Sequence, residues 1–421
     1  MNRDIARPKS RKPEVVTLPN GLRAVLAPCE AESVAFGVFV ASGSRHETAK
    51  TAGISHFIEH MLFKGTPTRR PIDITRAIEG RGGNFNACTG EESTCYFAHM
   101  PSECLAEAAD IISDMYLHAT VPEDEFAREK QVVLEEIKMY ADEPDAVAME
   151  NLQRSLFPRN QVGAPVAGSE RSLGPMKSAD LRRYMKTHYT PGATVAVVVG
   201  SFDRERALAE VERRLGPGAF RARKTAAVAT SVDFTVPPVA EVRSAKDVNQ
   251  AQLALGYRTF GADDERKYAA TVLDAVLGRG MSSRLFQEVR EKRGLSYDIA
   301  SRWQFFADAG MFTVAAGLDA AKAGEALKTI DREIGKVRSR KVPASELERT
   351  KEFLIGNFRL SHEKTVSKLF FYGSTLLSFG RLVTTDEQVE RIRAVTAEEM
   401  RDVAEDVLRP ANRSVSWVVP R

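Results

Sequence analysis

The chain has 421 residues, a formal net charge of +3 and 43% hydrophobic residues. This length suits two or more domains that each bury a core. The nearly balanced charge gives no reason to expect binding to nucleic acid or to a membrane surface, and no apolar run is long enough to span a bilayer.

The four cysteines, Cys29, Cys88, Cys95 and Cys104, form no C-x-x-C pair. We therefore expect reduced thiols and no disulfide framework, with Cys88 and Cys95 as core thiols of a strand region. Residues 1–15 are basic but lack an apolar stretch, so we predict a disordered tail on a cytoplasmic, bacterial protein. A mitochondrial presequence, and with it a location in the matrix, is the alternative.

In chain order, the first half begins with a hairpin at 17–26, with Asn20-Gly21 at its turn, and a strand at 33–43. A helix containing "GISHFIEHMLFKGT" follows. Further helices are predicted at 102–119, 122–140 and 178–189, with strands at 93–100 and 194–200.

The second half of the chain repeats the order of the first. Residues 178–200 match 396–420, 79–87 match 291–299, and 121–130 match 342–351. Chance similarity of unrelated helices does not explain several matches in the same order. We predict an α+β protein with two homologous domains, each a mainly antiparallel sheet flanked by helices. The expected domain ranges are 16–222 and 246–421, joined by a linker at 223–245.

The stretch "GISHFIEHMLFKGT" places His56, Glu59 and His60 within five residues. Positions four apart lie on one face of a helix, so the two imidazoles can hold one metal ion between them. Glu59 lies beside them, free to take a proton from a bound water, as in the inverted form of the H-E-x-x-H zinc motif. The alternative is an ordinary core helix with two satisfied histidines.

A catalytic zinc needs a third protein ligand and an open fourth position. The candidates lie in "REKQVVLEEIKMY", where Glu129 and Glu136 are two helical turns apart and share a face. The alternative is a solvated helix face, which we also expect for Glu135. Apolar packing of this helix is expected from Val132, Val133 and Ile137.

The internal repeat provides a control for these residues. It aligns Thr271, Asp274 and Ala275 with the three motif residues, and Thr350 and Asn357 with the two glutamates. Every candidate metal-site residue is therefore replaced in the second copy. The fold itself does not need them, which weakens a purely structural explanation.

Five segments carry a resemblance to a known family: "GSRHE", "GISHFIEHMLFKGT", "GGNFNACT", "VVLEEIKMY" and "SSRLFQEVREKRGLSY". Nearly the whole chain resembles the pitrilysin-type inverzincin metallopeptidases, which include insulin-degrading enzyme. It is most similar to short bacterial members and to the β subunit of the mitochondrial processing peptidase. The resemblance implies that the two domains form a clamshell half, and that in the family the halves face each other around a chamber.

The resemblance also implies a division of roles around the metal. His56, His60 and Glu136 would bind zinc, and Glu59 would be the general base. Glu129 would lie outside the ligand set and orient a ligand histidine.

Substrate-binding residues are implied in both halves. Asn86 and Ala87 would bind peptide backbone at an edge strand, and Arg290 and Tyr297 would contact substrate and assist catalysis. The implied activity is zinc-dependent hydrolysis of unfolded peptides that add to the sheet as an extended strand. The alternatives are a presequence-processing peptidase and a noncatalytic scaffold subunit. The expected assembly is a homodimer or a heterodimer with an inactive paralogue, with no nucleic-acid or membrane partner.

Overall fold

The computed structural model describes residues 12–222 and 229–421. Residues 1–11 of the expected tail and 223–228 of the expected linker lie outside the described residues. The strand β1 (Glu14–Thr17) pairs with β2 (Arg23–Pro28), which confirms the expected hairpin. Glu14 and Val15 therefore belong to a sheet, and the expectation that they are part of a disordered tail is wrong.

The described chain forms two units, each with its own sheet. The first contains the described residues up to Ile137 and those of 165–229 and 360–384, and the second contains 138–164, 230–359 and 385–421. Neither unit is a contiguous stretch like the expected ranges 16–222 and 246–421. Each unit instead includes one helix from the opposite half of the sequence.

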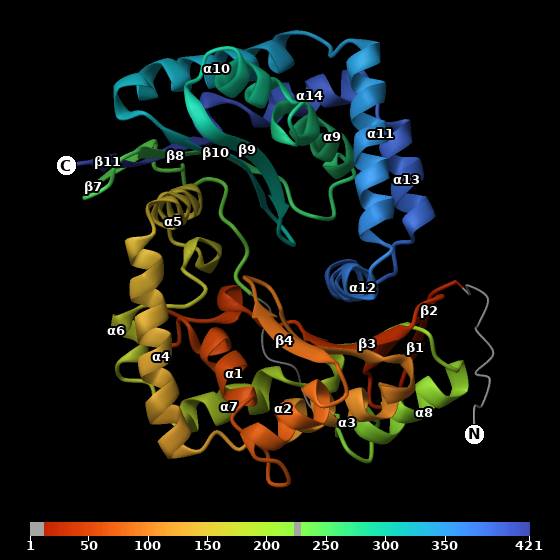
Figure 1. The fold of residues 1–421 in the computed structure, drawn as a ribbon. Coiled ribbons are helices and arrows are strands. Elements are labelled where there is room, and N and C mark those ends of the chain that lie inside the picture. Colours follow the sequence, from red (N-terminus) through yellow and green to blue (C-terminus); the bar gives the residue numbers. More distant parts are fainter. Residues whose placement is uncertain (1–11, 223–228) are drawn as a thin grey trace. The chain divides into compact units, whose positions relative to one another are not determined.

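The first unit is built on a six-stranded sheet in the order β1-β2-β6-β3-β5-β4 (Figure 1). Its remaining strands are β3 (Ser33–Val40), β4 (Asn84–Thr89), β5 (Thr94–Pro101) and β6 (Thr194–Gly200). Neighbouring strands are antiparallel except β2 and β6, which are parallel. The outer strand β4 carries the segment "NFNACT".

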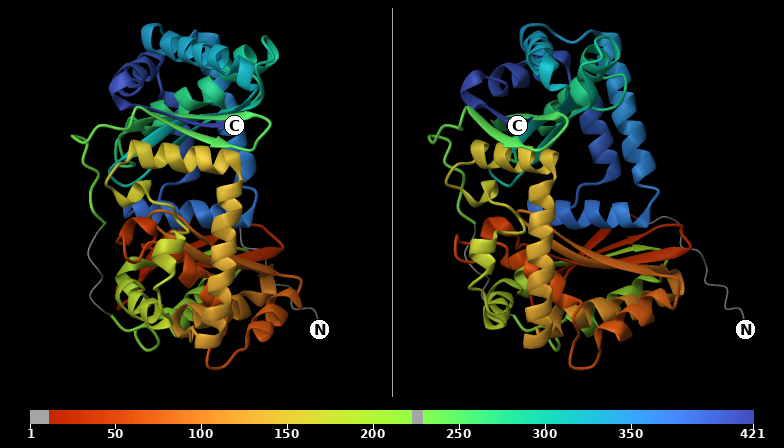
Figure 2. Two further views of the ribbon diagram at one scale, coloured as in Figure 1. Left: turned by 90° about the vertical axis from the view of Figure 1, so that its left-hand side faces the viewer. Right: turned by 60° about the vertical axis from the view of Figure 1, so that its left-hand side comes forward.

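Helices cover both faces of this sheet. The helix α3 (Leu105–His118) contacts β3 and β5, and α12 (Thr365–Phe379) lies along β3 and β6 (Figure 1 and Figure 2). Because side chains alternate along a strand, Phe36 joins one core cluster and Phe39 joins another that contains Leu369 of α12. The other helices are α1 (Ile54–Leu62), α2 (Pro71–Glu79), most of α4 (Glu123–Asp142), α6 (Glu170–Leu173), α7 (Ser178–His188) and α8 (Arg204–Leu215).

The second unit has a five-stranded sheet in the order β7-β11-β8-β10-β9. Its strands are β7 (Glu241–Lys246), β8 (Ala251–Thr259), β9 (Ser296–Phe305), β10 (Gly310–Leu318) and β11 (Arg413–Pro420). Its helices are α5 (Pro144–Leu156), α9 (Lys267–Gly278), α10 (Ala323–Ser339), α11 (Ala344–Ser361), α13 (Thr385–Ala394) and α14 (Ala397–Val407). The strand β7 takes up the end of the expected linker range, 223–245, because it pairs in parallel with β11.

The two sheets share one topology. In both, a parallel pair is followed by three antiparallel steps, so that β2-β6-β3-β5-β4 corresponds to β7-β11-β8-β10-β9. The exchanged helices occupy corresponding places, since α12 contacts β3 and β6 whereas α5 contacts β8 and β11. This correspondence confirms an α+β protein with two homologous domains.

Within 12–222 and 229–421, none of the helices combines the length and the apolar character needed to cross a bilayer.

Candidate metal centre

The helix α1 begins at a constrained turn. Gly53, which precedes its first residue, has φ of 90°, and a Cβ there would lie 2.5 Å from the carbonyl oxygen of Ala167. The carboxylate of Glu47 accepts hydrogen bonds from the backbone N–H groups of Gly53 and Ser55, at 2.7 and 2.8 Å. Burial raises the pKa of Glu47 to about 7, and the bonds to Ser55 and Gly53 oppose that rise. A buried carboxyl thus caps the amino end of the helix, where the unpaired N–H groups lie.

One face of α1 carries the residues that pack in the core, and another face carries the residues of the candidate metal centre. Its apolar residues lie in the core of the first unit: Ile54, Phe57, Ile58, Met61 and Leu62. His56, Glu59 and His60 are half-buried on the remaining face. The imidazole rings of His56 and His60 lie 4.7 Å apart, centroid to centroid, as expected for residues one turn apart.

Aromatic packing sets α4 against α1. Phe126 of α4 stacks on Phe57 of α1 with ring centroids 4.8 Å apart and planes 20° apart. The side of α4 that carries Phe126 also carries Val133, which is buried, and Ile137, which is half-buried. Val132 is 50% exposed, so the expectation that it packs in the core is wrong. It lies about 100° around the helix from Val133.

Three side chains from these two helices meet. The Nε2 atoms of His56 and His60 lie 3.6 and 3.3 Å from one carboxylate oxygen, Oε2, of Glu136. One ligand atom from each residue lies within 4.8 Å of the others, and no second cluster of this kind was found among the described residues. The structure therefore brings together the three residues that the resemblance assigns to the metal.

The two separations between Glu136 and the imidazoles fit a tetrahedral divalent ion. Bonds of roughly 2.0–2.1 Å at tetrahedral angles put two ligand atoms about 3.3–3.4 Å apart, close to the 3.3 and 3.6 Å observed. Burial lowers the pKa of His56, the neighbouring His60 lowers it further, and Glu136 opposes both effects. The net shift favours the neutral imidazole that a metal requires.

Glu129 contacts the other side of His60. Its Oε1 lies 2.9 Å from Nδ1 of His60, and its Oε2 pairs with Nζ of Lys64 at 2.5 Å. Burial raises the pKa of Glu129, but the hydrogen bonds from Lys64 and His60 outweigh burial, and the net pKa is lowered. An ionised acceptor at Nδ1 holds the proton there and leaves Nε2 free to bind a metal. In contrast, the buried Nδ1 of His56 has no hydrogen-bond partner in the part of the chain that the structure describes.

Glu59 makes its contacts with the end of β4. The hydroxyl of Thr89 donates to Oε2 of Glu59 at 2.5 Å, and the backbone of Thr89 bonds to the same carboxylate. Burial raises the pKa of Glu59, and the bonds from Thr89 oppose that rise. The charges of His60 and Glu136 also act on this carboxylate, so Glu59 lies within electrostatic reach of the ligand set.

Sequence reasoning missed three residues around the centre: Glu47, Lys64 and Thr89. Glu47 lies in "GSRHE" and Thr89 in "GGNFNACT", both noted only for the family resemblance. Thr89 is two residues after Ala87 on β4, so strand alternation places their side chains on one face. That alternation is the signal that could have found it, whereas the contacts of Glu47 and Lys64 depend on how the chain folds around α1.

Asn86 and Ala87 lie on β4, the outer strand of the first sheet. Oδ1 of Asn86 accepts the backbone N–H of Ala87 at 2.8 Å, and a bond of 2.9 Å from Gly90 N–H to Ser93 closes the turn after β4. Hydrogen-bonded and non-hydrogen-bonded pairs alternate along antiparallel strands, so the backbone groups of Ala87 and Thr89 point to the outer edge. This edge can accept a further strand.

Arg290 and Tyr297 belong to the second unit. Arg290 lies in a short π-helix (Phe286–Glu291), and Tyr297, 79% exposed, lies near the start of the outer strand β9. The guanidinium of Arg290 lies 5.2 Å from the ring centroid of Tyr297. The structure thus brings these two side chains into contact with one another.

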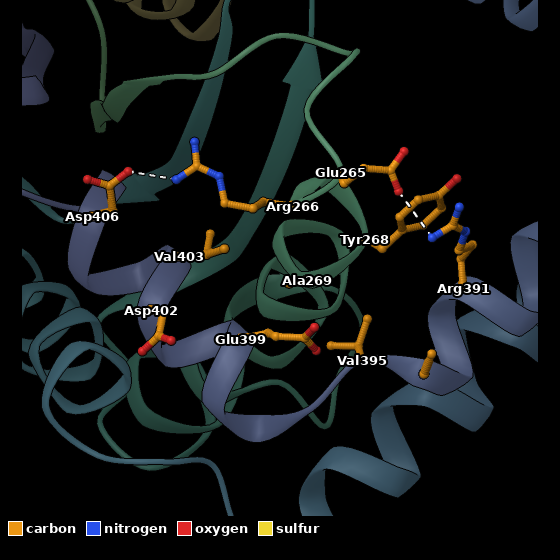
Figure 3. A pocket seen from close by; sticks show the side chains of 11 residues that line it. Glu265, Arg266, Tyr268, Ala269, Arg391, Val395, Glu399, Asp402, Val403 and Asp406 are labelled. Atoms are coloured by element: carbon orange, nitrogen blue, oxygen red, sulfur yellow. Dashed lines mark hydrogen bonds and ion pairs between the residues drawn. The ribbon is translucent and has the colours of Figure 1, made fainter.

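The second unit also contains a pocket of about 530 Å³ beside α9, α13 and α14 (Figure 3). Charged residues at its rim form ion pairs with one another: Arg266 with Asp406 at 2.9 Å and Arg391 with Glu265 at 3.2 Å. Its lining contains neither histidine nor cysteine. It offers no ligand set comparable to that of the first unit.

Comparison with known families gives two adjacent matches. Residues 24–170 match the model described as insulinase (peptidase family M16), and residues 175–354 match the peptidase M16 inactive domain. The candidate metal ligands His56, His60 and Glu136 fall in the first match. Arg290 and Tyr297 fall in the second.

Curated relatives align over most of the chain. An uncharacterized zinc protease of Bacillus subtilis, YmxG, is 37% identical over 389 residues, or 92% of this chain and 94% of the relative. An uncharacterized zinc protease of Mycobacterium tuberculosis is 35% identical over 94% of this chain and 91% of the relative. The fold is similar to that of a crystal structure of a protease from Helicobacter pylori, with a TM-score of 0.92 at 22% identity, covering 98% of this chain and 100% of that one.

Proposed function

The chain belongs to the insulinase (M16) family of peptidases, and on that premise we propose that it is a zinc-dependent endopeptidase. The observation that carries the proposal is the meeting of His56, His60 and Glu136 within 4.8 Å. Relatives over most of the chain are named zinc proteases, which supports zinc as the ion. The loss of all three ligands in the second homologous domain supports a single centre per chain.

A zinc ion bound by these ligands would polarise the scissile carbonyl and lower the pKa of a water molecule. Glu59 then serves as general base, taking a proton from the attacking water and passing it to the leaving nitrogen. Thr89 holds one oxygen of that carboxylate, which keeps the base in place during both transfers. Glu129 and Lys64 hold the imidazole of His60 in the orientation that ligation needs.

The substrate in this proposal is an unfolded peptide that pairs with the outer edge of β4. The outward backbone groups of Ala87 support this, because main-chain pairing recognises an extended segment of almost any sequence. Asn86 already bonds the N–H of Ala87, so an incoming strand would replace that local bond with one of its own. Arg290 and Tyr297 are proposed to contact the substrate, and their contact with each other supports a shared role.

Two other functions remain as alternatives to a general peptidase: a presequence-processing peptidase and a noncatalytic scaffold subunit. A processing peptidase would cut a basic presequence at one site, whereas a general peptidase would cut many unrelated peptides. A noncatalytic scaffold subunit would cut neither. A cytoplasmic homodimer is the proposed context, and a heterodimer with an inactive paralogue is its alternative.

The test is a mixed library of unstructured peptides, incubated with the zinc-loaded protein and analysed by mass spectrometry. We expect many cuts in the wild type, none after chelation, and recovery on return of zinc. Glu59→Gln should keep zinc and lose roughly 10²–10⁴-fold in kcat, because a positioned base contributes that much. Wild-type turnover in Glu59→Gln would refute the assignment of the base, and turnover that survives complete metal removal would refute zinc dependence.

A further inference from the structure

Two cysteines face each other across the strands β4 and β5. Cys88 of β4 is directly opposite Cys95 of β5 in the antiparallel register, so both side chains lie on the same face of the sheet. Directly opposite residues have Cα atoms about 4.5–5.5 Å apart, and disulfides span about 4.4–6.8 Å between Cα atoms. The backbone spacing therefore permits a disulfide between them.

The two thiols differ in exposure. Cys88 is exposed, contrary to the expectation that it is a core thiol, whereas Cys95 is buried at 2% exposure in the cluster beneath α12. A hydrogen bond from the Cys95 thiol lowers the pKa of Cys88 despite partial burial, and burial raises the pKa of Cys95 well above its usual value. An accessible thiol with a lowered pKa next to a second thiol is the arrangement found in reversibly oxidised pairs.

The other cysteines lack this arrangement. Cys104 is buried at the start of α3, where its thiol bonds to Glu107, and Cys29 lies half-buried after β2. Neither is directly opposite another cysteine in the registers of the two sheets. They provide internal controls for oxidation.

A disulfide here would displace β4. The N–H of Gly90 donates to the carbonyl oxygen of Ser93, which is the bond expected at a hydrogen-bonded position of the ladder. Cys88 and Cys95 lie two steps along the ladder, so we infer that they too occupy a hydrogen-bonded position. Such pairs have Cα atoms about 5.5 Å apart, and their Cβ atoms must come within roughly 3.5–4.5 Å for a disulfide to form. Because β5 is held between β3 and β4 while β4 is paired on one side only, β4 is the strand that shifts.

A displacement of β4 would also displace Thr89, which contacts Glu59 beside the metal centre. Thr89 follows Cys88 directly, and its hydroxyl and backbone both bond to Glu59. Displacement of a catalytic group by about 1 Å can cost on the order of 100-fold in rate.

We propose that Cys88 and Cys95 form a thiol modification site, at which a hydroperoxide generates a reversible disulfide that lowers the peptidase activity of the neighbouring centre. The effect on activity rests on the proposed function, whereas the formation of the disulfide does not.

The chemistry requires one hydroperoxide for each disulfide. The thiolate of Cys88 attacks hydrogen peroxide, forming an S–O bond as the O–O bond breaks and hydroxide leaves. The Cys95 thiol loses its proton and attacks the Cys88 sulfur, forming the S–S bond and expelling the sulfenic oxygen as water. Two thiols lose two electrons and two protons in total, and one peroxide is reduced to two waters. A dithiol reductant reverses the reaction by thiol–disulfide exchange.

The experiment uses the full, zinc-loaded chain treated with hydrogen peroxide, blocked with N-ethylmaleimide and digested without reduction. Cleavage after glutamate is needed, because Glu91, Glu92 and Glu103 separate Cys88, Cys95 and Cys104 into different peptides. Trypsin would leave the three cysteines in one peptide, since no lysine or arginine lies between Arg81 and Arg128. We expect a linked Cys88–Cys95 peptide, an activity loss of at least tenfold, unchanged zinc content, and recovery with dithiothreitol.

Variants separate this site from general oxidation. Cys88→Ser should keep basal activity and lose the response to peroxide, whereas a Cys29→Ser, Cys104→Ser double variant should respond like wild type. The proposal is overturned if peroxide consumes Cys88 without producing the linked peptide, or if the linked protein is as active as the reduced one. If the reduced protein cleaves no peptide at all, the proposed function fails, and peptide mapping alone then decides whether the dithiol forms.

Discussion

The hydroxyl of Thr89 donates a hydrogen bond of 2.5 Å to the carboxylate of Glu59. Thr89 ends the outer strand β4, and Glu59 lies on α1 between two candidate metal ligands. The bond therefore joins the edge proposed to bind substrate to the group proposed to move the proton. The hydroxyl of Thr94 donates to the carbonyl oxygen of Ser42 at 2.9 Å and to the Thr89 hydroxyl at 3.4 Å, so Thr89 accepts from Thr94 and donates its own proton to Glu59.

Replacing Thr89 with valine should lower kcat while zinc content stays the same. The substitution keeps the shape of the side chain and removes a hydrogen bond to a charged group, worth about 1.5–3 kcal/mol, or roughly 10- to 100-fold in rate. Thr89→Ser should restore most of the activity, since it returns the hydroxyl. Steady-state kinetics on one peptide would test this. Equal kcat values for Thr89→Val and wild type would show that the bond does not position the base.

Loss of the carboxylate at Glu129 should weaken zinc binding without abolishing it. Outer partners of ligand histidines contribute about 10- to 100-fold in metal affinity. We expect Glu129→Ala to lose this whole contribution to zinc affinity. Glu129→Gln should lose less, because its amide oxygen still accepts a hydrogen bond from Nδ1 of His60, although it no longer carries a negative charge beside Lys64. Competition with a chromophoric chelator gives the affinities. The reverse order, with Gln weaker than Ala, would contradict this role.

Glu135 and Glu136 form a matched pair on α4. Glu136 contacts both imidazoles, whereas the neighbouring Glu135 is exposed and outside the group of ligand atoms. Glu136→Ala should lose more zinc affinity than the roughly 10- to 100-fold expected for an outer partner, and Glu135→Ala should stay close to wild type. Zinc content after dialysis would distinguish them. Similar losses in both variants would mean that the effect comes from the charge of the helix and not from ligation.

The packing of α12 on the first sheet can be tested at Gly373. A Cβ at this position would lie 2.4 Å from the ring of Phe39, which is 2% exposed. Gly373→Ala should therefore destabilise the protein by about 1–3 kcal/mol, the usual range for overpacking. Ser374→Ala, one residue on and exposed, should change stability by no more than about 0.5 kcal/mol. Chemical denaturation measures both, and an unchanged midpoint for Gly373→Ala would show that α12 does not press on Phe39 in solution.

Several features of the site could be predicted from the sequence because they depend on local spacing. The distance of four residues between His56 and His60 places both imidazoles on one face of any helix that contains them. The alternation of β3 and the turn at Gly21 predicted strands and a hairpin for the same reason. Self-similarity between the halves predicted two related units, and the matching strand order of the two sheets confirms it.

Other features depended on packing between distant segments. From spacing alone, Glu129 and Glu136 were equivalent, since both lie on one face of α4. The stacking of Phe126 on Phe57 sets how α4 lies against α1, and in that arrangement Glu129 bonds to Nδ1 of His60 and to Lys64 while Glu136 meets both Nε2 atoms.

The amino-acid sequence by itself determined that a helix would present two imidazoles and a carboxyl group on one face, because helical geometry follows from residue spacing. Only the tertiary structure decided which remote carboxylate meets those imidazoles, that Thr89 bonds to Glu59, and that α5 and α12 cover the sheets of the opposite halves. The physical reason is that such contacts join residues tens to hundreds of positions apart. They form only when apolar surfaces from distant segments pack together, as Phe57 packs on Phe126 and Phe39 packs on α12. Local periodicity does not specify which helix or strand a given apolar surface will pack against.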